Sequence, residues 1–364
     1  MEQSKSVQQT LANQNFESIF LTSTANVFYT TNFYTDPHER LVGVYFHEQT
    51  APVLIVPSLE KQDAIQAGWT GDIISYQDHE KPWELFYHYL EKNDTIPKTM
   101  AIEKEHMTVD RLESIQANFP NLTLHNGSQF MYDSRMIKTA EEYKILKQAA
   151  KLADYGVEIG VQAIKEGKSE LEIVAEIEYQ LKKQGVQEMA FSTMVLTGEK
   201  TASPHGNPSL DTIKPGDMVL FDLGVVYQGY CSDITRTVAY KYASDEQKKI
   251  YQTVLEAQEK AIKAAKLGVA LGQLDQVARG HIETAGFGEY FTHRLGHGIG
   301  IDVHEFPSLT ATNDLPLASG MCFTIEPGIY VPNVAGVRIE DQIFITETET
   351  KVLNRYPKTL QIIE

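Results

Sequence analysis

Five residues of the kinds that bind metal ions stand in chain order, each inside a distinctive local sequence. One imidazole and four carboxylates form a hard, oxygen-rich ligand set that suits manganese, iron, cobalt or zinc. A single aspartate in a strand is more often hydrogen-bonded than metal-bound, so only the combination of five indicates a site for two metal ions. The chain is therefore predicted to be a dinuclear metallohydrolase. The five are Asp222 in FDLG, Asp233 in GYCSDITRT, His297 in HRLGHGIGIDVHEFP, Glu326 in TIEPGIY and Glu340 in VRIEDQIF.

The two aspartates are predicted to lie on neighbouring strands of one hairpin. Asp222 is part of the apolar run MVLFDLGVV, which is typical of a buried strand, where a bare carboxylate costs free energy. A second strand is expected over 230–240, and Gln228-Gly229 is typical of a two-residue hairpin turn. This turn pairs position 222 with position 235. Because position 233 is two residues from 235 on the same strand, both aspartates are expected on one face of the hairpin. Carboxylates at such a short distance repel each other unless a cation or a shared proton lies between them.

The remaining ligands are expected near the same centre. Glycines alternate around His297 in the run GHGIG, which lets the backbone pass close to a bulky centre without a side chain in the way. On the last strand, alternation places Arg338 on the same face as Glu340. We expect Arg338 to steady Glu340 or Asp233, and we also count it among the candidate substrate contacts.

These motifs give the chain a resemblance to a known family. From about 134 to about 345 it resembles the pita-bread metallopeptidases, the family of methionine aminopeptidase, aminopeptidase P and prolidase. It has all five ligand motifs in order, with SPHG at 203–206 upstream and DVHE at 302–305 downstream. The resemblance implies three roles for the five ligands. Asp222 would chelate one metal ion, Asp233 and Glu340 would bridge both, and His297 and Glu326 would complete the second.

The chemistry expected of such a site is hydrolysis. Two divalent ions ~3.5–4 Å apart can hold a bridging water, lower its pKa toward neutrality and polarise the scissile carbonyl. Glu326 is the best candidate for passing the proton from that water to the leaving nitrogen. The resemblance further implies that His205 and His304 lie just outside the metal ligands, where they contact substrate and stabilise charge in the tetrahedral intermediate.

The substrate is predicted to be an Xaa-Pro dipeptide. The segment before the core disfavours a bare methionine aminopeptidase, and the chain looks most like the compact prolidases of lactic acid bacteria and related Gram-positive bacteria. A dipeptidase must bind a free carboxylate, for which the fork of Arg294 is well suited, although a structural ion pair is the alternative. Asp36 and His38 belong to the loop 31–43, which is either a solvated charged turn or a mobile lid over the substrate.

Other functions stay open. Aminopeptidase P would release the first residue from longer Xaa-Pro peptides. A pita-bread protein that binds partners without catalysis is a second alternative, but such a protein would be expected to lose ligands, and all five are present. Creatinase-like chemistry without metal is disfavoured for the same reason.

Composition narrows the partners and the compartment. The 32 basic and 49 acidic residues give a formal net charge of -17, which argues against nucleic acid or an anionic membrane as a partner. No segment offers the roughly 20 apolar residues of a membrane helix. Only Cys231 and Cys322 are available, so we expect no disulfide framework and a cytoplasmic protein. The expected partners are a small peptide substrate, two divalent metal ions (manganese first, then cobalt or zinc) and a second subunit in a homodimer.

The chain length of 364 residues and the pattern of elements predict two α/β (α+β) domains. An N-terminal creatinase/prolidase-type domain is expected over 1–125, a linker over 126–138 and the pita-bread catalytic domain over 139–364. Within the latter, a long helix, a second helix and then strands occur twice, which predicts a pseudo-two-fold core with the metal site between its halves. The predicted helices are 139–165 and 171–183 in the first half and 245–266 and 271–285 in the second.

Overall fold

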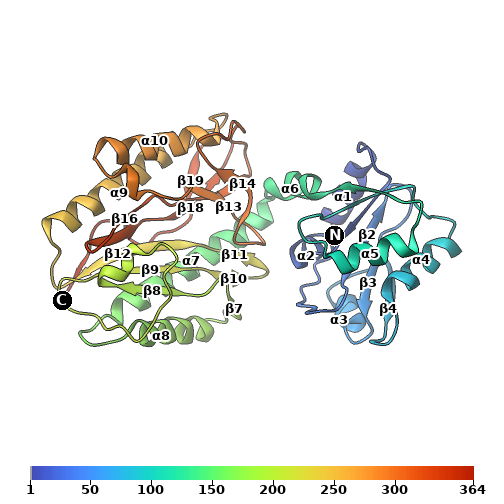
Figure 1. The fold of residues 1–364 in the computed structure, drawn as a ribbon, viewed down its shortest axis with the longest axis horizontal. Helices are drawn as coiled ribbons and strands as arrows, with labels where there is room; N and C mark the ends of the chain where they lie inside the picture. The colour runs from blue at the N-terminus through green and yellow to red at the C-terminus, as the bar shows by residue number, and fades with distance from the viewer. Residues whose placement is uncertain (1) are drawn as a thin grey trace. The chain divides into compact units, whose positions relative to one another are not determined.

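The computed structural model describes residues 2–364, and the chain divides into two compact units, Met1–Ser134 and Arg135–Glu364 (Figure 1). The expected linker, 126–138, includes a helix, α6 (Ser128–Met136), and the boundary between the units falls within this helix. Within residues 2–364, no helix combines the length and the apolar character needed to cross a bilayer.

The first unit is built on one six-stranded mixed sheet in the order β4-β3-β2-β1-β5-β6. The pairs β1–β5, β3–β4 and β5–β6 are parallel, whereas β1–β2 and β2–β3 are antiparallel. Two buried clusters hold helices against the sheet, one around Phe46 and the other around Phe86. This arrangement confirms the mixed α/β domain that the sequence predicts. The elements are α1 (Glu2–Leu11), β1 (Ser18–Leu21), α2 (Thr24–Thr31), β2 (Gly43–His47), β3 (Val53–Pro57), α3 (Lys61–Gln66), β4 (Asp72–Tyr76), α4 (Pro82–Lys92), β5 (Thr99–Ile102), α5 (Val109–Asn118) and β6 (Thr123–Asn126).

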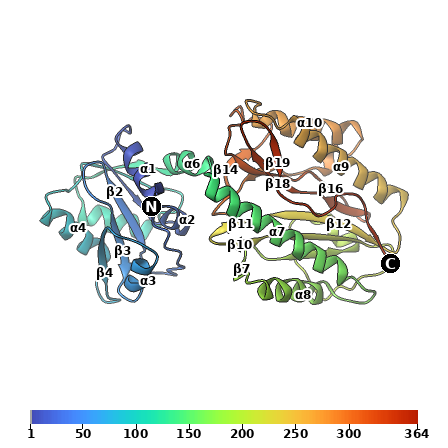
Figure 2. The same ribbon diagram turned by 180° about the vertical axis from the view of Figure 1, so that it is seen from behind.

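The second unit consists of two similar halves, each with a helix pair packed on a sheet. In Figures 1 and 2, α8 lies on one side of the strands and the pair α9 and α10 on the other. This confirms the pseudo-two-fold core. The first half contains α7 (Ala140–Gln162), α8 (Glu170–Lys183), β8 (Met194–Thr197), β9 (Met218–Leu223), β12 (Ile234–Tyr240) and β20 (Ile362–Ile363); the second contains α9 (Asp245–Ala264), α10 (Leu271–Thr284), β13 (Gly296–Gly298), β14 (Glu305–Leu309), β15 (Cys322–Ile325), β18 (Asp341–Ile345) and β19 (Thr350–Val352).

Local sequence explains where the helices of this unit begin. Ser169 accepts a hydrogen bond from the backbone N–H of Glu172, whose side chain accepts one in return from the backbone N–H of Ser169. Ser244 and Gln247 form the same reciprocal pair at the start of α9. Each capping box satisfies two backbone donors that have no partner within the helix. The sequence patterns Ser-x-x-Glu and Ser-x-x-Gln are the signatures of such boxes.

Smaller elements complete the unit and close the hairpin that carries the aspartates. Antiparallel pairing joins Thr235 to Asp222 and Tyr227 to Tyr230, which confirms the predicted register. The turn residues Gln228 and Gly229 both have positive φ, 50° and 79°, as a tight two-residue hairpin turn requires. The smaller elements are β7 (Glu188–Met189), η1 (Gly198–Ala202), β10 (Val225–Tyr227), β11 (Tyr230–Cys231), η2 (Gly288–Tyr290), β16 (Gly328–Val331) and β17 (Ala335–Arg338).

Candidate metal centre

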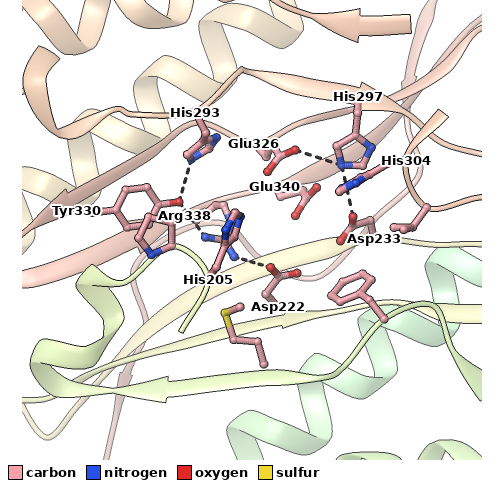
Figure 3. A pocket seen from close by; sticks show the side chains of 14 residues that line it. His205, Asp222, Asp233, His293, His297, His304, Glu326, Tyr330, Arg338 and Glu340 are labelled. Atoms are coloured by element: carbon pink, nitrogen blue, oxygen red, sulfur yellow. Dashed lines mark hydrogen bonds and ion pairs between the residues drawn. The ribbon is translucent and has the colours of Figure 1, made fainter. Parts of the chain in front are cut away.

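A cavity of about 220 Å³ lies within the second unit and receives side chains from both of its halves (Figure 3). It is smaller than the roughly 300–1,000 Å³ of sites that take drug-sized ligands, so it suits a small ligand. All five predicted metal ligands line it, as do His205, His304 and Arg338. Its lining residues are Phe191, Met194, Pro204, His205, Asp222, Asp233, His293, His297, Val303, His304, Glu326, Tyr330, Arg338 and Glu340.

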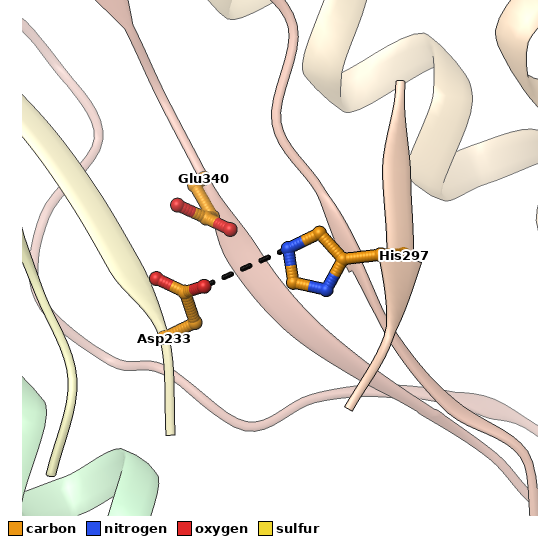
Figure 4. A group of neighbouring side chains, drawn as sticks. All are labelled: Asp233, His297 and Glu340. Atoms are coloured by element: carbon orange, nitrogen blue, oxygen red, sulfur yellow. Dashed lines mark ion pairs between the residues drawn. The ribbon is translucent and has the colours of Figure 1, made fainter. Parts of the chain in front are cut away.

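Asp233, His297 and Glu340 form the centre of this group (Figure 4). One potential ligand atom of each lies within 4.8 Å of those of the other two, and the three residues are at most 5% exposed. Asp233 follows β11 in the first half of the unit, whereas His297 and Glu340 belong to the second half. The fold therefore brings together three potential metal ligands, of which the first and the last are more than 100 positions apart in the sequence.

His297 is oriented with one ring nitrogen toward the carboxylates. Its Nε2 lies 3.2 Å from Glu326 Oε1 and 3.7 Å from Asp233 Oδ2. Its Nδ1 lies 3.1 Å from the carbonyl oxygen of Gly298, a distance at which a protonated Nδ1 donates to that oxygen. With a metal ion bound, such a bond would leave the lone pair on Nε2, the nitrogen that would coordinate the ion. On one side of His297, Gly296 is required because a Cβ there would lie 2.0 Å from the carbonyl oxygen of Thr324.

Asp222 is held by Arg338, whose three donor nitrogens reach three different groups. Nη2 donates to Asp222 Oδ2, Nη1 to the hydroxyl of Tyr330 at 2.8 Å, and Nε to the hydroxyl of Thr235 at 3.1 Å. The sequence led us to expect Glu340 or Asp233 as the partner of Arg338. The guanidinium instead pairs with Asp222, while Glu340 accepts the Thr235 hydroxyl at 2.7 Å.

Burial and mutual repulsion shift the pKa values of the acidic side chains in the cavity. Burial and the charges of Glu340 and Asp222 hold the pKa of Asp233 well above its usual range. Burial and the charge of Glu326 likewise hold the pKa of Glu340 well above its usual range. Burial also raises the pKa of Asp222, although Arg338 opposes this. In Glu326 burial is outweighed by the hydrogen bond and charge of His297, which lower the pKa to about 2.

The donor set fits metal ions. One oxygen each of Asp222, Asp233 and Glu340 is buried without a hydrogen-bond partner among the described residues. Unpaired buried carboxylate oxygens are costly, and coordination to cations is one of the few arrangements that satisfies them. Four carboxylates face one guanidinium here, and two divalent cations would compensate the excess negative charge.

The predicted catalytic histidines, His205 and His304, both line the cavity and lie outside the named helices and strands. Figure 3 shows His304 next to His297, and the two rings are T-shaped with centroids 4.2 Å apart. Partial burial, together with His297 and Arg294, lowers the pKa of His304 to about 4, so this imidazole is neutral at neutral pH. His205 is exposed and lines the cavity through the loop after η1.

The predicted substrate contacts lie in different surroundings. Arg294 is not among the cavity-lining residues, and its Nη1 donates to the hydroxyl of Ser308 at 3.2 Å. Asp36 and His38 belong to the first unit, in a loop between α2 and β2. Their side chains are 79% and 73% exposed, and the backbone N–H of His38 donates to Asp36 Oδ1 at 3.2 Å.

The sequence analysis does not anticipate two polar residues of the cavity, His293 and Tyr330. His293 Nε2 lies 2.9 Å from the Tyr330 hydroxyl, which in turn accepts from Arg338, so the three form a chain beside Asp222. Burial lowers the pKa of His293 and raises that of Tyr330 to about 12. His293 stands only four positions before His297 in the sequence, and this nearness was the available signal.

Comparison with known proteins agrees with this geometry. A family model described as Metallopeptidase family M24 matches residues 144–347, and one described as Creatinase/Prolidase N-terminal domain matches residues 3–137. The chain is 43% identical over 359 residues to a protein of Lactobacillus helveticus named Xaa-Pro dipeptidase, which covers 98% of each. It also resembles the solved structure of an Xaa-Pro dipeptidase from Bacillus anthracis, with a TM-score of 0.92, 32% identity and coverage of 100% of this chain and 99% of that one. An X-Pro aminopeptidase structure from Thermotoga maritima gives a TM-score of 0.86 and 32% identity over 98% of this chain and 100% of that one.

Proposed function

The chain belongs to metallopeptidase family M24, and on that premise we propose that it hydrolyses Xaa-Pro dipeptides. One observation carries the proposal: four carboxylates and one histidine converge on a small cavity, and three of the carboxylate oxygens are buried without a hydrogen-bond partner among the described residues. The proposed metal ligands are Asp222, Asp233, His297, Glu326 and Glu340.

The side chains of the cavity would have different roles in the reaction. When bound, two divalent ions supply Lewis-acid polarisation of the scissile carbonyl and activation of water. Arg338 holds Asp222 in place, and the hydroxyl of Thr235 does so for Glu340. Glu326 has a carboxylate oxygen 3.2 Å from His297 Nε2 at the centre of the site, where it would take a proton from water and pass it to the leaving nitrogen.

The two catalytic histidines would act on the substrate. His304 is neutral at neutral pH, so one ring nitrogen can donate a hydrogen bond to the carbonyl oxygen as negative charge develops there. His205 borders the same cavity and would contact the peptide. Neither histidine needs to act as a nucleophile, because bound metal ions would supply an activated water for that role.

A dipeptide suits the site better than a longer peptide. The cavity is small, and relatives that match nearly the whole chain carry the name Xaa-Pro dipeptidase. Arg294 and Arg338 are the proposed partners of the substrate carboxylate, and Asp36 and His38 remain proposed contacts from the loop 31–43. Aminopeptidase P activity is the second candidate, favoured by the likeness to the Thermotoga structure. A protein without catalysis is disfavoured because all five ligand positions keep metal-binding side chains.

We further propose manganese as the metal, with cobalt or zinc as alternatives, a homodimer as the assembly and the cytoplasm as the compartment. The oxygen-rich donor set supports manganese. Free, buried Cys231, whose thiol donates to the carbonyl oxygen of Ile301 at 3.2 Å, is compatible with a reducing compartment. Metal analysis of protein purified without added metal and sedimentation of the full chain test the first two proposals.

The experiment for the proposed function pairs metal content with turnover. Protein stripped with a chelator should not cleave Leu-Pro, and activity should return in step with the binding of two manganese ions per chain. Full reconstitution with two ions and no release of proline would contradict the proposal.

A further inference from the structure

Glu305 directly follows His304 in the chain, but its carboxylate is not part of the cavity lining. It is held instead by two cations from the first residues of the second unit. Arg135 Nη2 donates to Oε1, and Lys138 Nζ lies 3.2 Å from Oε2. The side chains of Arg135, Lys138 and Glu305 are 10%, 2% and 5% exposed, so water screens these ion pairs little.

The same carboxylate closes the turn that carries His304. The backbone N–H of Asp302 donates to Glu305 Oε1 at 3.0 Å, and Arg135 Nη2 also lies 2.8 Å from Asp302 Oδ2. The carbonyl oxygen of Asp302 accepts from the backbone N–H of Gly300 at 3.1 Å. Both residues that flank Val303 and His304 are therefore fixed to one cluster of ion pairs and hydrogen bonds, defined here as the Glu305 clamp (Arg135, Lys138, Asp302 and Glu305).

The imidazole of His304 depends on that turn for its orientation. Among the described residues, the imidazole of His304 packs in a T-shaped arrangement against the ring of His297. This contact alone restrains rotation and displacement of the His304 ring only weakly. A displacement of about 1 Å in a group that contacts the reacting atoms can cost on the order of 100-fold in rate. The backbone of the 302–305 turn must therefore be held firmly if His304 is to serve the reaction.

We propose that Glu305 is a positioning residue for His304. Clamped between Arg135 and Lys138, it fixes the turn so that the imidazole faces the cavity. This inference rests on the role given to His304 under the proposed function. It extends that role to residues that touch neither substrate nor metal.

A double-mutant cycle separates positioning from a general structural role. The substitutions are Glu305→Gln, which keeps the shape of the side chain and removes its charge, and His304→Ala, measured alone and together on Leu-Pro with manganese-loaded protein. Glu305→Gln should lower kcat by on the order of 100-fold and change KM little, because the lost contact matters in the transition state. In the His304→Ala background, the same substitution should change kcat by no more than about twofold, since the residue it acts through is gone.

Asp154→Asn is the matched control. Asp154 is a partly buried carboxylate that also anchors a chain segment, because it accepts hydrogen bonds from the backbone N–H groups of Arg355 and Tyr356 at 2.6 and 3.1 Å. It does not line the cavity. Any effect of Asp154→Asn on kcat should be the same with and without His304. All variants should bind as much manganese as the unsubstituted protein.

A spectroscopic readout tests the position of the ring without relying on turnover. In metal-free protein labelled with ¹⁵N and ¹³C at histidine, the His304 signal is the one that disappears in His304→Ala. Glu305→Gln should shift or broaden that signal more than any other histidine signal. Should Glu305→Gln fail to fold, Lys138→Gln removes one of the two cations, leaves the pair with Arg135, and is carried through the same cycle.

Two results would overturn the inference: an equal loss of kcat in both backgrounds, or a His304 signal that does not move. If His304→Ala alone leaves kcat unchanged, the role of His304 in the proposed function is wrong. The histidine signal then still decides whether Glu305 positions the ring, so the two failures are distinguishable.

Discussion

Asp233 and Glu340 reach one centre from opposite halves of the second unit, with a carboxylate oxygen of each within 4.8 Å of the other and within the same distance of a His297 nitrogen. Each has an oxygen without a hydrogen-bond partner among the described residues, and each carboxylate has a raised pKa. Two buried acids with these properties tolerate full ionisation only with a cation between them. This relationship is why we regard the cavity as a metal site and not as a polar pocket.

Asp233→Asn should abolish hydrolysis of Leu-Pro. An amide offers one neutral oxygen where the bridging role needs two anionic ones, so metal binding should also weaken. Turnover and metal content per chain are measured on the same samples, with Glu347→Gln, an exposed acid outside the cavity, as control. Retained activity with full metal occupancy would refute the bridging role.

Arg338→Lys should destabilise the metal-loaded protein by about 2 kcal/mol. A lysine ammonium can keep the positive charge near Asp222, but it loses the hydrogen bonds to Tyr330 and Thr235. Each of these hydrogen bonds is worth about 1 kcal/mol. Urea unfolding of the two proteins measures the difference. Arg355→Lys, at an exposed position, should leave the free energy of unfolding unchanged. Equal stability of Arg338→Lys and the unsubstituted protein would show that the guanidinium geometry is unimportant.

The local parts of this site could be predicted from the sequence, and the nonlocal parts could not. The register that pairs Asp222 with Thr235 follows from a two-residue turn and strict alternation, both of which are encoded within 20 residues. The pairing of Arg338 with Asp222 depends on how two halves of the unit meet, 116 positions apart in the chain. The alternation of side chains along the last strand places Arg338 on the same face as Glu340. It contains no information about which of the four carboxylates the guanidinium contacts.

The same reasoning applies to Arg294, a proposed substrate contact. Sequence spacing put Arg294 three residues before His297, but the direction of its side chain is decided by Ser308 on a neighbouring strand. The Glu305 clamp was also invisible, because its cations lie about 170 positions upstream, in a segment whose sequence shows only ordinary helix-boundary features.

The free energy of unfolding should depend on pH through the ionisation of Glu305. Burial alone would raise the pKa of this carboxyl, but Arg135 and Lys138 outweigh burial and lower it to about 2. A lowered pKa in the folded state contributes stability above the unfolded value near 4.5, and that contribution is lost as pH falls toward 2. The difference in unfolding free energy between the unsubstituted protein and Glu305→Gln should therefore shrink by about 3 kcal/mol between pH 6 and pH 2. A difference that is independent of pH would contradict the ion-pair account.

Arg294→Met should raise the KM for Leu-Pro by about tenfold or more, because a hydrogen bond to a charged group is worth roughly 1.5–3 kcal/mol. The control is a change of substrate: Leu-Pro amide lacks the carboxylate, so its KM should not respond to the substitution. An equal rise for both substrates would assign Arg294 to a structural role with Ser308.

Side-by-side hydrolysis of Leu-Pro and Leu-Pro-Gly by manganese-loaded protein, with chelated protein as control, tests the central claim most directly. We predict rapid cleavage of the dipeptide, little cleavage of the tripeptide, and none of either after chelation. Cleavage of the tripeptide as readily as the dipeptide would contradict the dipeptidase assignment in favour of aminopeptidase P. Cleavage that survives chelation, or failure to cleave either peptide when loaded, would contradict the metal-dependent mechanism itself.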